Sequence, residues 1–378
     1  MNVSTAAPGF AAAAFDRGDI AAPVHAHDVS VSVIIPAFNA ATSIARCLAS
    51  VLSQPLAGIE IIVVDDGSAD GTADAVSAVA RVHAGANIRV HRQSNQGVSV
   101  ARNAGLRLAR GRYVMFVDAD DALAIKALPR LLRRAEAERL DVLLCNAWWH
   151  DLGGGAARVM LRTRESWSGS GGAWIERQVK ARQLKHYVWC QFIRREWLVG
   201  SGLRFIPGIT HQDIVWTNEL LLNAQRVGFD PTPRYHYWQR AGSLSQPRDS
   251  AARLNAACHY LRVAAALDAL AKSRPPGPLR VALAWQTVEE GIAVLHLARR
   301  LTPGHRERLY ARIQSAGHVP RLFANALTPR HRLRVLKRSA RFLIWQAAQR
   351  VGRWFTGRGT PAVSAASAQS PQSQFGGD

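Results

Sequence analysis

An apolar run ends abruptly in three carboxylates at Tyr113-Val114-Met115-Phe116-Val117-Asp118-Ala119-Asp120-Asp121. Apolar residues without alternation are typical of a buried parallel strand, and open α/β sheets bind ligands at the carboxyl ends of such strands. Carboxylates this close repel one another, so we interpret Asp120 and Asp118 as ligands of a divalent cation, Mg or Mn, that bridges to a phosphate. In isolation the same residues could equally cap the next helix, because Asp accepts hydrogen bonds from free N–H groups there.

Two earlier segments show the same order of an apolar run followed by polar residues. Val31–Ile35 leads into Pro36-Ala37-Phe38-Asn39, and Ile59–Val64 leads into Asp65-Asp66-Gly67-Ser68. Between them, residues 42–53 carry apolar side chains at helical spacing, so the three segments predict a βαβ unit. A helix from Asp70, a short strand at Ile88–Val90 and a loop entering a helix at Asn95–Gly105 extend the pattern. We therefore predict a doubly wound, mostly parallel α/β sheet flanked by helices.

The order and spacing of these motifs resemble glycosyltransferase family 2, whose GT-A enzymes move a sugar from a nucleotide diphosphate to an acceptor. The resembling segments are Val33–Asn39, Val63–Ser68, Asn95–Gly105 and Phe116–Asp121, and the likeness extends over roughly residues 29–245. A fifth segment, Phe205–Asp213, is similar to the family segment in which an acidic residue directly precedes the aspartate that acts as catalytic base. Here Gln212 stands in place of the usual Glu, and Asp213 is retained.

The resemblance implies a site for a nucleotide-sugar donor, with uridine diphosphate the leading expectation for the nucleotide. Its residues are Pro36, Ala37, Asp65, Asp66, Asn95, Arg102 and Asp118. Asp66 is the preferred acceptor for a uracil-type N–H. For two of the residues a structural alternative stays open, in which Asn95 only holds its loop and Arg102 lies on the surface of a helix.

The expected chemistry follows from these residue types. A cation held by Asp120, with Asp118 helping, neutralises the charge that develops on the leaving diphosphate. Asp213 is a carboxylate base for the acceptor hydroxyl. No second candidate nucleophile for a covalent intermediate stands out, so we expect inversion at the sugar carbon. The acceptor is expected to be a glycan or a lipid-linked acceptor in bacterial-type surface polysaccharide or lipopolysaccharide synthesis.

Composition agrees with an enzyme that has one main catalytic domain and additions. The chain has 378 residues and an apolar content of 48%, enough for a sizeable core. Its four cysteines show neither metal-ligand spacing nor a disulfide framework. We find no apolar run of bilayer length, and the Ala-rich start lacks the basic region of a signal peptide. We therefore expect a cytoplasmic protein that is peripheral at the inner face of the cytoplasmic membrane.

The predicted organisation has five parts. These are a flexible leader at 1–28, a nucleotide-sugar-binding half at 29–140, an acceptor-binding and catalytic-base half at 141–250, a helical extension with a basic amphipathic tail at 251–358, and a disordered tail at 359–378. The extension contains a break at Arg274–Pro278 between two helical stretches. In the second part, Trp189 could stack on a sugar, but an aromatic flanked by apolar residues is more often part of a core.

The net charge of +21 is concentrated in the extension. Basic residues crowd the segment 330–353, and on a helix its apolar residues would form one stripe: Leu333, Leu336, Ala340, Leu343, Ile344, Ala347, Val351, Trp354 and Phe355. This pattern is typical of a helix that lies on an anionic membrane, and we predict that residues 330–355 bind such a surface. The alternative is a helix docked on the protein's own core with a solvated basic face.

Two other function classes fit parts of the sequence. A nucleic-acid-binding protein would explain the charge, but the sequence has no recognisable nucleic-acid motif or stacking platform, so we expect no nucleic-acid partner. A phosphohydrolase could use Asp118 as nucleophile and Asp120 as acid. That interpretation gives no role to Pro36, Asp66 or Asp213.

Overall fold

The computed structural model describes residues 29–151, 153, 155–239 and 249–356, with side chains as far as residue 350. It divides into two compact units. The first comprises the chain up to residue 168 together with 187–207 and 224–238, and the second comprises 169–186, 208–223 and the chain from 239 onward. The predicted leader at 1–28 and tail at 359–378 lie outside the described residues.

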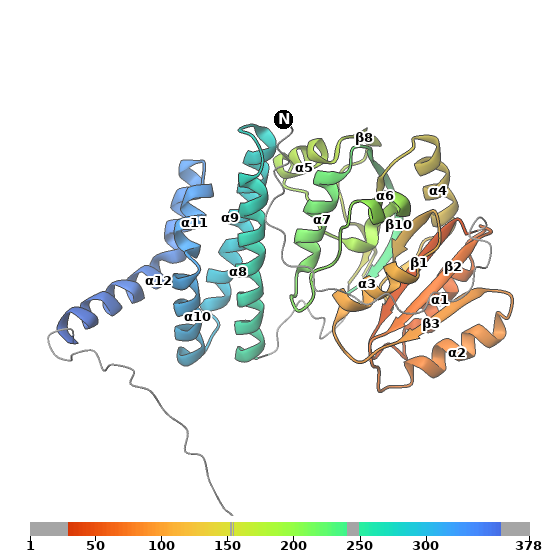
Figure 1. Cartoon of the computed structure of the whole chain (residues 1–378), viewed down its shortest axis with the longest axis horizontal. Helices are drawn as coiled ribbons and strands as arrows, with labels where there is room; N and C mark the ends of the chain where they lie inside the picture. The colour runs from red at the N-terminus through yellow and green to blue at the C-terminus, as the bar shows by residue number, and fades with distance from the viewer. Residues whose placement is uncertain (1–28, 152, 154, 240–248, 357–378) are drawn as a thin grey trace, which may run out of the picture. The chain divides into compact units, whose positions relative to one another are not determined.

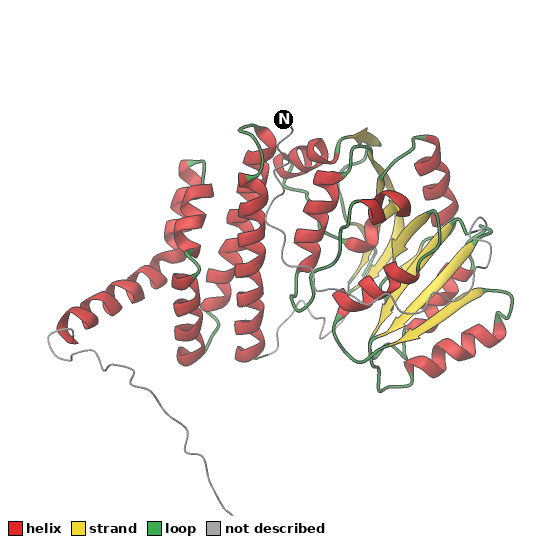
Figure 2. Ribbon diagram, in the orientation of Figure 1, coloured by secondary structure: helices red, strands yellow, loops and turns green. Residues whose placement is uncertain are grey.

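A ten-stranded mixed sheet forms the centre of the first unit (Figures 1 and 2). Its strands are β1 (Val31–Ala37), β2 (Ile59–Asp65), β3 (Asn87–Arg92), β4 (Tyr113–Phe116), β5 (Ala122–Leu123), β6 (Val142–His150), β7 (Arg158–Val159), β8 (Trp167–Gly169), β9 (Gln191–Arg194) and β10 (Val227–Trp238). The main path runs β3-β2-β1-β4-β9-β6-β10-β5. Pairing is parallel from β3 to β4 and between β6 and β10, and antiparallel β9 joins these two groups. The predicted boundary at residue 140 therefore falls within one continuous sheet.

Helices cover both faces of this sheet. They are α1 (Ile44–Leu52), α2 (Thr72–Val82), α3 (Val98–Leu108), α4 (Ala127–Ala137) and α6 (Arg195–Gly200), with a 3-10 turn at Val188–Cys190. The apolar stripe of α1 joins the core formed by alternate residues of β1, such as Val33 and Ile35. On the other face α3 packs closely on Ile34, since a Cβ atom added to Gly105 would lie 2.3 Å from Ile34 Cγ2. The predicted doubly wound α/β architecture is confirmed.

The order of the strands predicts where on this sheet a ligand binds. From β1 the chain passes outward to β2 and β3, and then returns to add β4 on the other side of β1. In open α/β sheets, ligands bind outside the carboxyl ends of the strands where the strand order reverses in this way. Here that place lies beyond Ala37 at the end of β1 and Phe116 at the end of β4.

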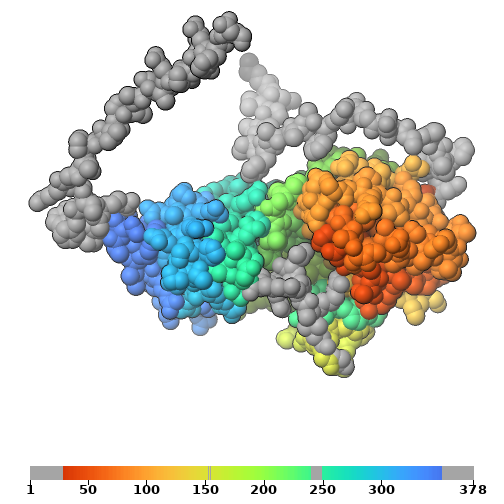
Figure 3. Space-filling model, turned by 90° about the horizontal axis from the view of Figure 1, so that it is seen from below, coloured from red at the N-terminus to blue at the C-terminus, as the bar shows by residue number. Residues whose placement is uncertain are grey.

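The described part of the second unit is helical apart from the end of β8. Its helices are α5 (Gly171–Lys180), α7 (Gln212–Asn223), α8 (Ser250–Lys272), α9 (Pro278–Ala298), α10 (Pro303–Ser315), α11 (His318–Asn325) and α12 (Pro329–Thr356). The predicted break at 274–278 separates α8 from α9, and Pro278 occupies the first turn of α9. Reciprocal side-chain hydrogen bonds between Asn218 and Gln286 join α7 to α9. In Figure 3 the teal and blue surfaces of α8 to α12 are continuous, and the predicted helical extension is confirmed.

The last helix, α12, docks through a face that sequence periodicity did not select. Val335, Ser339 and Phe342 are buried against the other helices of the unit. The predicted apolar stripe lies on another face, where Leu333, Leu336 and Ile344 are 51%, 48% and 70% exposed. Among the described members of the stripe, Leu343 packs partly on the core. The side chains of Val351, Trp354 and Phe355 lie outside the described residues.

The alternative, a helix docked on the protein's own core with a solvated basic face, is confirmed for α12 through Val335 and Phe342. Leu333, Leu336 and Ile344 lie outside this contact and remain exposed. Within the described ranges, no helix is long and apolar enough to cross a membrane.

Candidate functional site

The carboxyl ends of β1 and β2 bring four of the predicted residues together. Pro36 and Ala37 end β1, and Ala37 is in register with Asp65 at the end of β2. The Asp66 backbone N–H donates to the Ala37 carbonyl at 2.8 Å, which extends the pairing by one residue. The two strand ends therefore form one continuous edge at the place that the topology selects.

Asp66 is bound to the loop that follows β3. Its Oδ1 accepts from the Gln93 side chain at 2.8 Å and the Gln96 backbone at 2.9 Å, and its Oδ2 accepts from the Gly97 backbone at 2.8 Å. Gly67 has a φ of +77°, and a Cβ atom there would lie 2.8 Å from the Asn95 backbone nitrogen. These contacts fix the Asn95 loop beside the edge.

Asp65 is 1% exposed at the end of β2. Its Oδ1 accepts from the Ser68 backbone at 2.9 Å. Its buried Oδ2 has no hydrogen-bond donor among the described residues, although Arg92 Nε lies 3.5 Å away. The Arg92 guanidinium therefore offsets the negative charge of this buried carboxylate.

Arg102 is 6% exposed, so the alternative in which it lies on the helix surface is wrong. Its guanidinium donates to Asp118 Oδ1 at 3.0 Å. It also lies 5.4 Å from the centre of the Phe205 ring. A charge-assisted hydrogen bond to a buried guanidinium holds the Asp118 carboxylate in one orientation.

The acidic loop (Asp118–Asp121) is fastened from β10, a contact that sequence reasoning missed. The buried Tyr235 hydroxyl accepts from the Asp118 backbone N–H at 3.0 Å and donates to Asp121 Oδ2 at 2.8 Å. The Trp238 backbone N–H donates to Asp121 Oδ1 at 3.0 Å. Burial, and then the charges of Asp120 and Asp118, raise the pKa of Asp121 well above its usual range. Asp121 therefore has a structural position, while Asp118 and Asp120 remain partly exposed.

Asp120 is held through its backbone. Its carbonyl accepts from Arg46 on α1, whose guanidinium carbon lies 4.2 Å from the centre of the Trp238 ring. No group of three or more His, Cys, Asp and Glu side chains with metal-site geometry occurs among the described residues. Mg-type cations are commonly held by one or two carboxylates together with substrate phosphates and water, so Asp118 and Asp120 fit a cation that a diphosphate completes.

Trp189 belongs to the core, as the sequence favoured. It is 5% exposed and stacks on Tyr235 and Tyr187, with ring centres 4.4 Å and 4.7 Å apart. This stack supports the Tyr235 ring whose hydroxyl fastens the acidic loop.

The predicted base, Asp213, lies in the second unit, in the first turn of α7. Its neighbour Gln212 is buried, and Gln212 Oε1 has no hydrogen-bond partner among the described residues. The His211 ring stacks on Tyr260 of α8 at 4.2 Å between centres. Burial, followed by the charges of Asp213 and Glu289, raises the pKa of Glu290 on α9 to about 7. Asp213 therefore lies among ionisable and aromatic groups, an arrangement typical of functional sites.

Comparisons with known proteins give one consistent result. Residues 32–199 match the family model described as "Glycosyl transferase family 2". The chain is 32% identical over 334 residues to "Uncharacterized glycosyltransferase YibD" of Escherichia coli K12, covering 84% of this chain and 92% of that protein.

Two solved structures share the fold. The S. aureus protein TarS in complex with UDP-GlcNAc aligns with a TM-score of 0.55 and 20% identity, over 77% of this chain and 89% of that one. A mannosyltransferase of Pyrobaculum calidifontis in complex with GDP-Man and Mn²⁺ aligns with a TM-score of 0.51 and 18% identity, over 86% and 88%. These alignments confirm the predicted GT-A fold.

Proposed function

The chain belongs to glycosyltransferase family 2. We propose that it is an inverting, cation-dependent enzyme that transfers a sugar from a nucleotide diphosphate to a hydroxyl of a glycan or lipid-linked acceptor in surface polysaccharide biosynthesis. The observation that carries this proposal is the acidic loop at the reversal of strand order, held by buried Arg102 and Tyr235. Two partly exposed carboxylates, Asp118 and Asp120, on a loop held at that place suit the diphosphate of a donor. Because the chain belongs to this family, we set aside the two alternative functions, a nucleic-acid-binding protein and a phosphohydrolase.

Each residue has a proposed role in donor binding. Asp118 and Asp120 would hold the cation, which stabilises the charge on the departing diphosphate. Asp65 would border the nucleoside from the end of β2, with its buried Oδ2 held 3.5 Å from Arg92 Nε. Asp66, with three donors already, positions the Asn95 loop around the nucleotide. Pro36 and Ala37 would present the backbone of β1 to the nucleoside of the donor.

Asp213 is proposed to accept the proton of the acceptor hydroxyl. A carboxylate base activates a hydroxyl that is a poor nucleophile at neutral pH, and a single displacement inverts the sugar carbon. The proposal derives from the position of Asp213 in the family motif and from its retention where Gln212 replaces Glu.

We also propose that α12 lies on an anionic bilayer. The exposed Leu333, Leu336 and Ile344 form one arc of the helix, because successive residues are about 100° apart. Exposed basic residues flank this arc on both sides: Arg332 and Arg350 on one, and Lys337 and Arg341 on the other. Each contributes roughly 1 kcal/mol near an anionic surface, and the apolar arc adds burial in the headgroup region. A lipid-linked acceptor would then be within reach of the enzyme.

Thermal shift with nucleotide sugars tests the donor proposal. A ligand bound only by the folded protein adds about 2.7 kcal/mol at a hundredfold excess over its Kd, so the cognate donor should raise Tm in the presence of Mn²⁺. Asp120→Asn should remove the Mn²⁺-dependent part of this shift and most of the transfer. The matched control is Asp74→Asn, at an exposed aspartate of α2. An Asp120→Asn enzyme with the wild-type rate and metal dependence would contradict the proposed cation site.

A further inference from the structure

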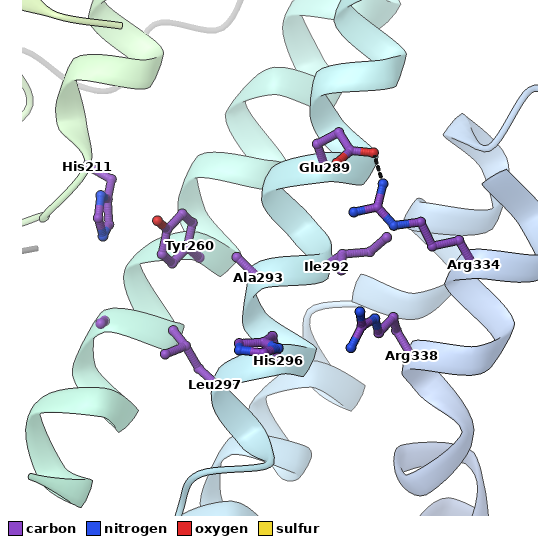
Figure 4. A pocket seen from close by; sticks show the side chains of 10 residues that line it. His211, Tyr260, Glu289, Ile292, Ala293, His296, Leu297, Arg334 and Arg338 are labelled. Carbon is purple, nitrogen blue, oxygen red and sulfur yellow. Dashed lines mark hydrogen bonds and ion pairs between the residues drawn. The ribbon is translucent and has the colours of Figure 1, made fainter. Parts of the chain in front are cut away.

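The second unit contains an open pocket of about 360 Å³ that lies entirely within that unit (Figure 4). Sites for small molecules usually measure roughly 300–1,000 Å³, so this one can hold a single sugar with a substituent. Its walls come from α8, α9 and α12, together with His211 just before α7.

One end of the pocket is cationic. Figure 4 shows Arg334 and Arg338 extending from α12 toward α9, with Arg334 ending at Glu289. Among the side chains that the structure describes, no carboxylate pairs with Arg338. Because Arg334 is neutralised by Glu289 and Arg338 is not, the lining carries a net positive charge at neutral pH.

The arginines around His296 also indicate a positive charge at this end of the pocket. Burial, and then Arg300, Arg338 and Arg299, lower the pKa of His296, so it is neutral at pH 7 and offers an N–H donor without charge. Of these three arginines Arg338 lines the pocket, next to Arg334. An anion with several acceptor oxygens fits such a group of donors.

The other end is aromatic and lies beside the proposed base. His211 and Tyr260 face each other there, and Asp213 follows His211 by two residues. The pKa of Tyr260 is raised by burial and then by the charges of Glu290 and Asp213, so both carboxylates lie near its ring. Aromatic side chains with a polar edge suit the apolar face and hydroxyls of a sugar.

We propose that this pocket binds a phosphorylated saccharide, with the phosphate at Arg338 and Arg334 and the sugar against Tyr260. This inference rests on the proposed glycosyl transfer, since the saccharide would be the acceptor that presents its hydroxyl to Asp213. It defines the acceptor class as a sugar that carries a phosphate ester.

Calorimetric titration with glucose 6-phosphate, glucose and dihexanoyl phosphatidic acid tests the proposal on the full chain. Glucose 6-phosphate should bind the wild-type protein at least about tenfold more tightly than glucose, and Arg338→Gln should weaken it about tenfold or more. Arg308→Gln, at an exposed arginine of α10 away from the pocket, removes the same charge and should leave binding unchanged.

Absence of glucose 6-phosphate binding, equal affinity for glucose, or equal losses in Arg338→Gln and Arg308→Gln would overturn the proposal. Tighter, Arg338-dependent binding of phosphatidic acid would overturn the saccharide assignment and identify a lipid headgroup instead. Titration of a nucleotide-sugar donor into the same preparations tests glycosyl transfer separately. Donor binding without glucose 6-phosphate binding refutes only the pocket, and the reverse result refutes the proposed function.

Discussion

Tyr235→Phe is the substitution that tests how the acidic loop is held. The hydroxyl is fully buried and serves two partners, the Asp118 N–H and the Asp121 carboxylate. Its removal leaves both without that partner, and an unsatisfied buried polar group costs roughly 1–3 kcal/mol. The ring and its stack on Trp189 remain, so no cavity of side-chain size forms. We expect a loss of roughly 2–4 kcal/mol of unfolding free energy.

Calorimetric melting measures this loss, which corresponds to a decrease in Tm of roughly 4–16 °C for a unit of this size. Transfer should also need more Mn²⁺, because Asp118 and Asp120 are no longer held in one arrangement. The matched control is Tyr113→Phe in the same sheet. Tyr113 is buried and stacks on Phe192, and its hydroxyl makes no hydrogen bond within the described chain, so the change should cost less than about 0.5 kcal/mol. Equal melting temperatures of Tyr235→Phe and the wild-type chain would show that the Tyr235 hydroxyl does not hold the acidic loop.

Asp213→Asn should keep its affinity for the donor and lose about 10² to 10⁴ in turnover, because it removes a base; calorimetry and a transfer assay measure the two effects. Burial and the charges of Asp213 and Glu289 raise the pKa of Glu290 from 4.5 to about 7. Its protonated form therefore stabilises the fold below pH 4.5, and this contribution is lost as pH rises through 7. Glu290→Gln should thus stabilise the chain by roughly 2–3 kcal/mol at pH 8 and change little at pH 4 in denaturant unfolding. Leu336→Asp with Ile344→Asp should keep the wild-type Tm and abolish sedimentation with phosphatidylglycerol vesicles, because both side chains are exposed.

Each of these predictions has an outcome that contradicts it. Lost donor binding in Asp213→Asn, with normal turnover of the residual complex, would assign Asp213 to the donor site. An equal gain from Glu290→Gln at both pH values would argue against protonation as the cause. For the membrane variant the control is Val82→Asp on α2, where the native side chain is 80% exposed. Vesicle binding that both variants retain would show that the exposed arc of α12 does not touch the bilayer.

Much of the sheet in the first unit could be predicted from the sequence because its signals are local. A buried parallel strand is a continuous apolar run, so β1, β2 and β4 were placed to within two residues of their observed ends. The polar residues that follow parallel strands must lie at one edge of the sheet. We could therefore predict that Asp65, Asp66, Asp118 and Asp120 lie at the same edge. The contacts that fasten them were not predictable in this way. Tyr235 is 114 residues from Asp121 in the chain, and its own strand shows no pattern that distinguishes it.

Sequence patterns were enough to predict the fold class, the edge of the sheet that carries the acidic residues and an amphipathic basic helix, because periodicity and motif order depend on neighbours in the chain. Tertiary structure decided that Arg102 is a buried partner of Asp118 and that Asp66 is bound to the Asn95 loop. It also decided which face of α12 is covered, since α12 docks through Val335, Ser339 and Phe342 and leaves the predicted stripe mostly exposed. The physical reason is that a helix with more than one apolar arc can bury any of them, and the choice depends on the shape of segments distant in sequence.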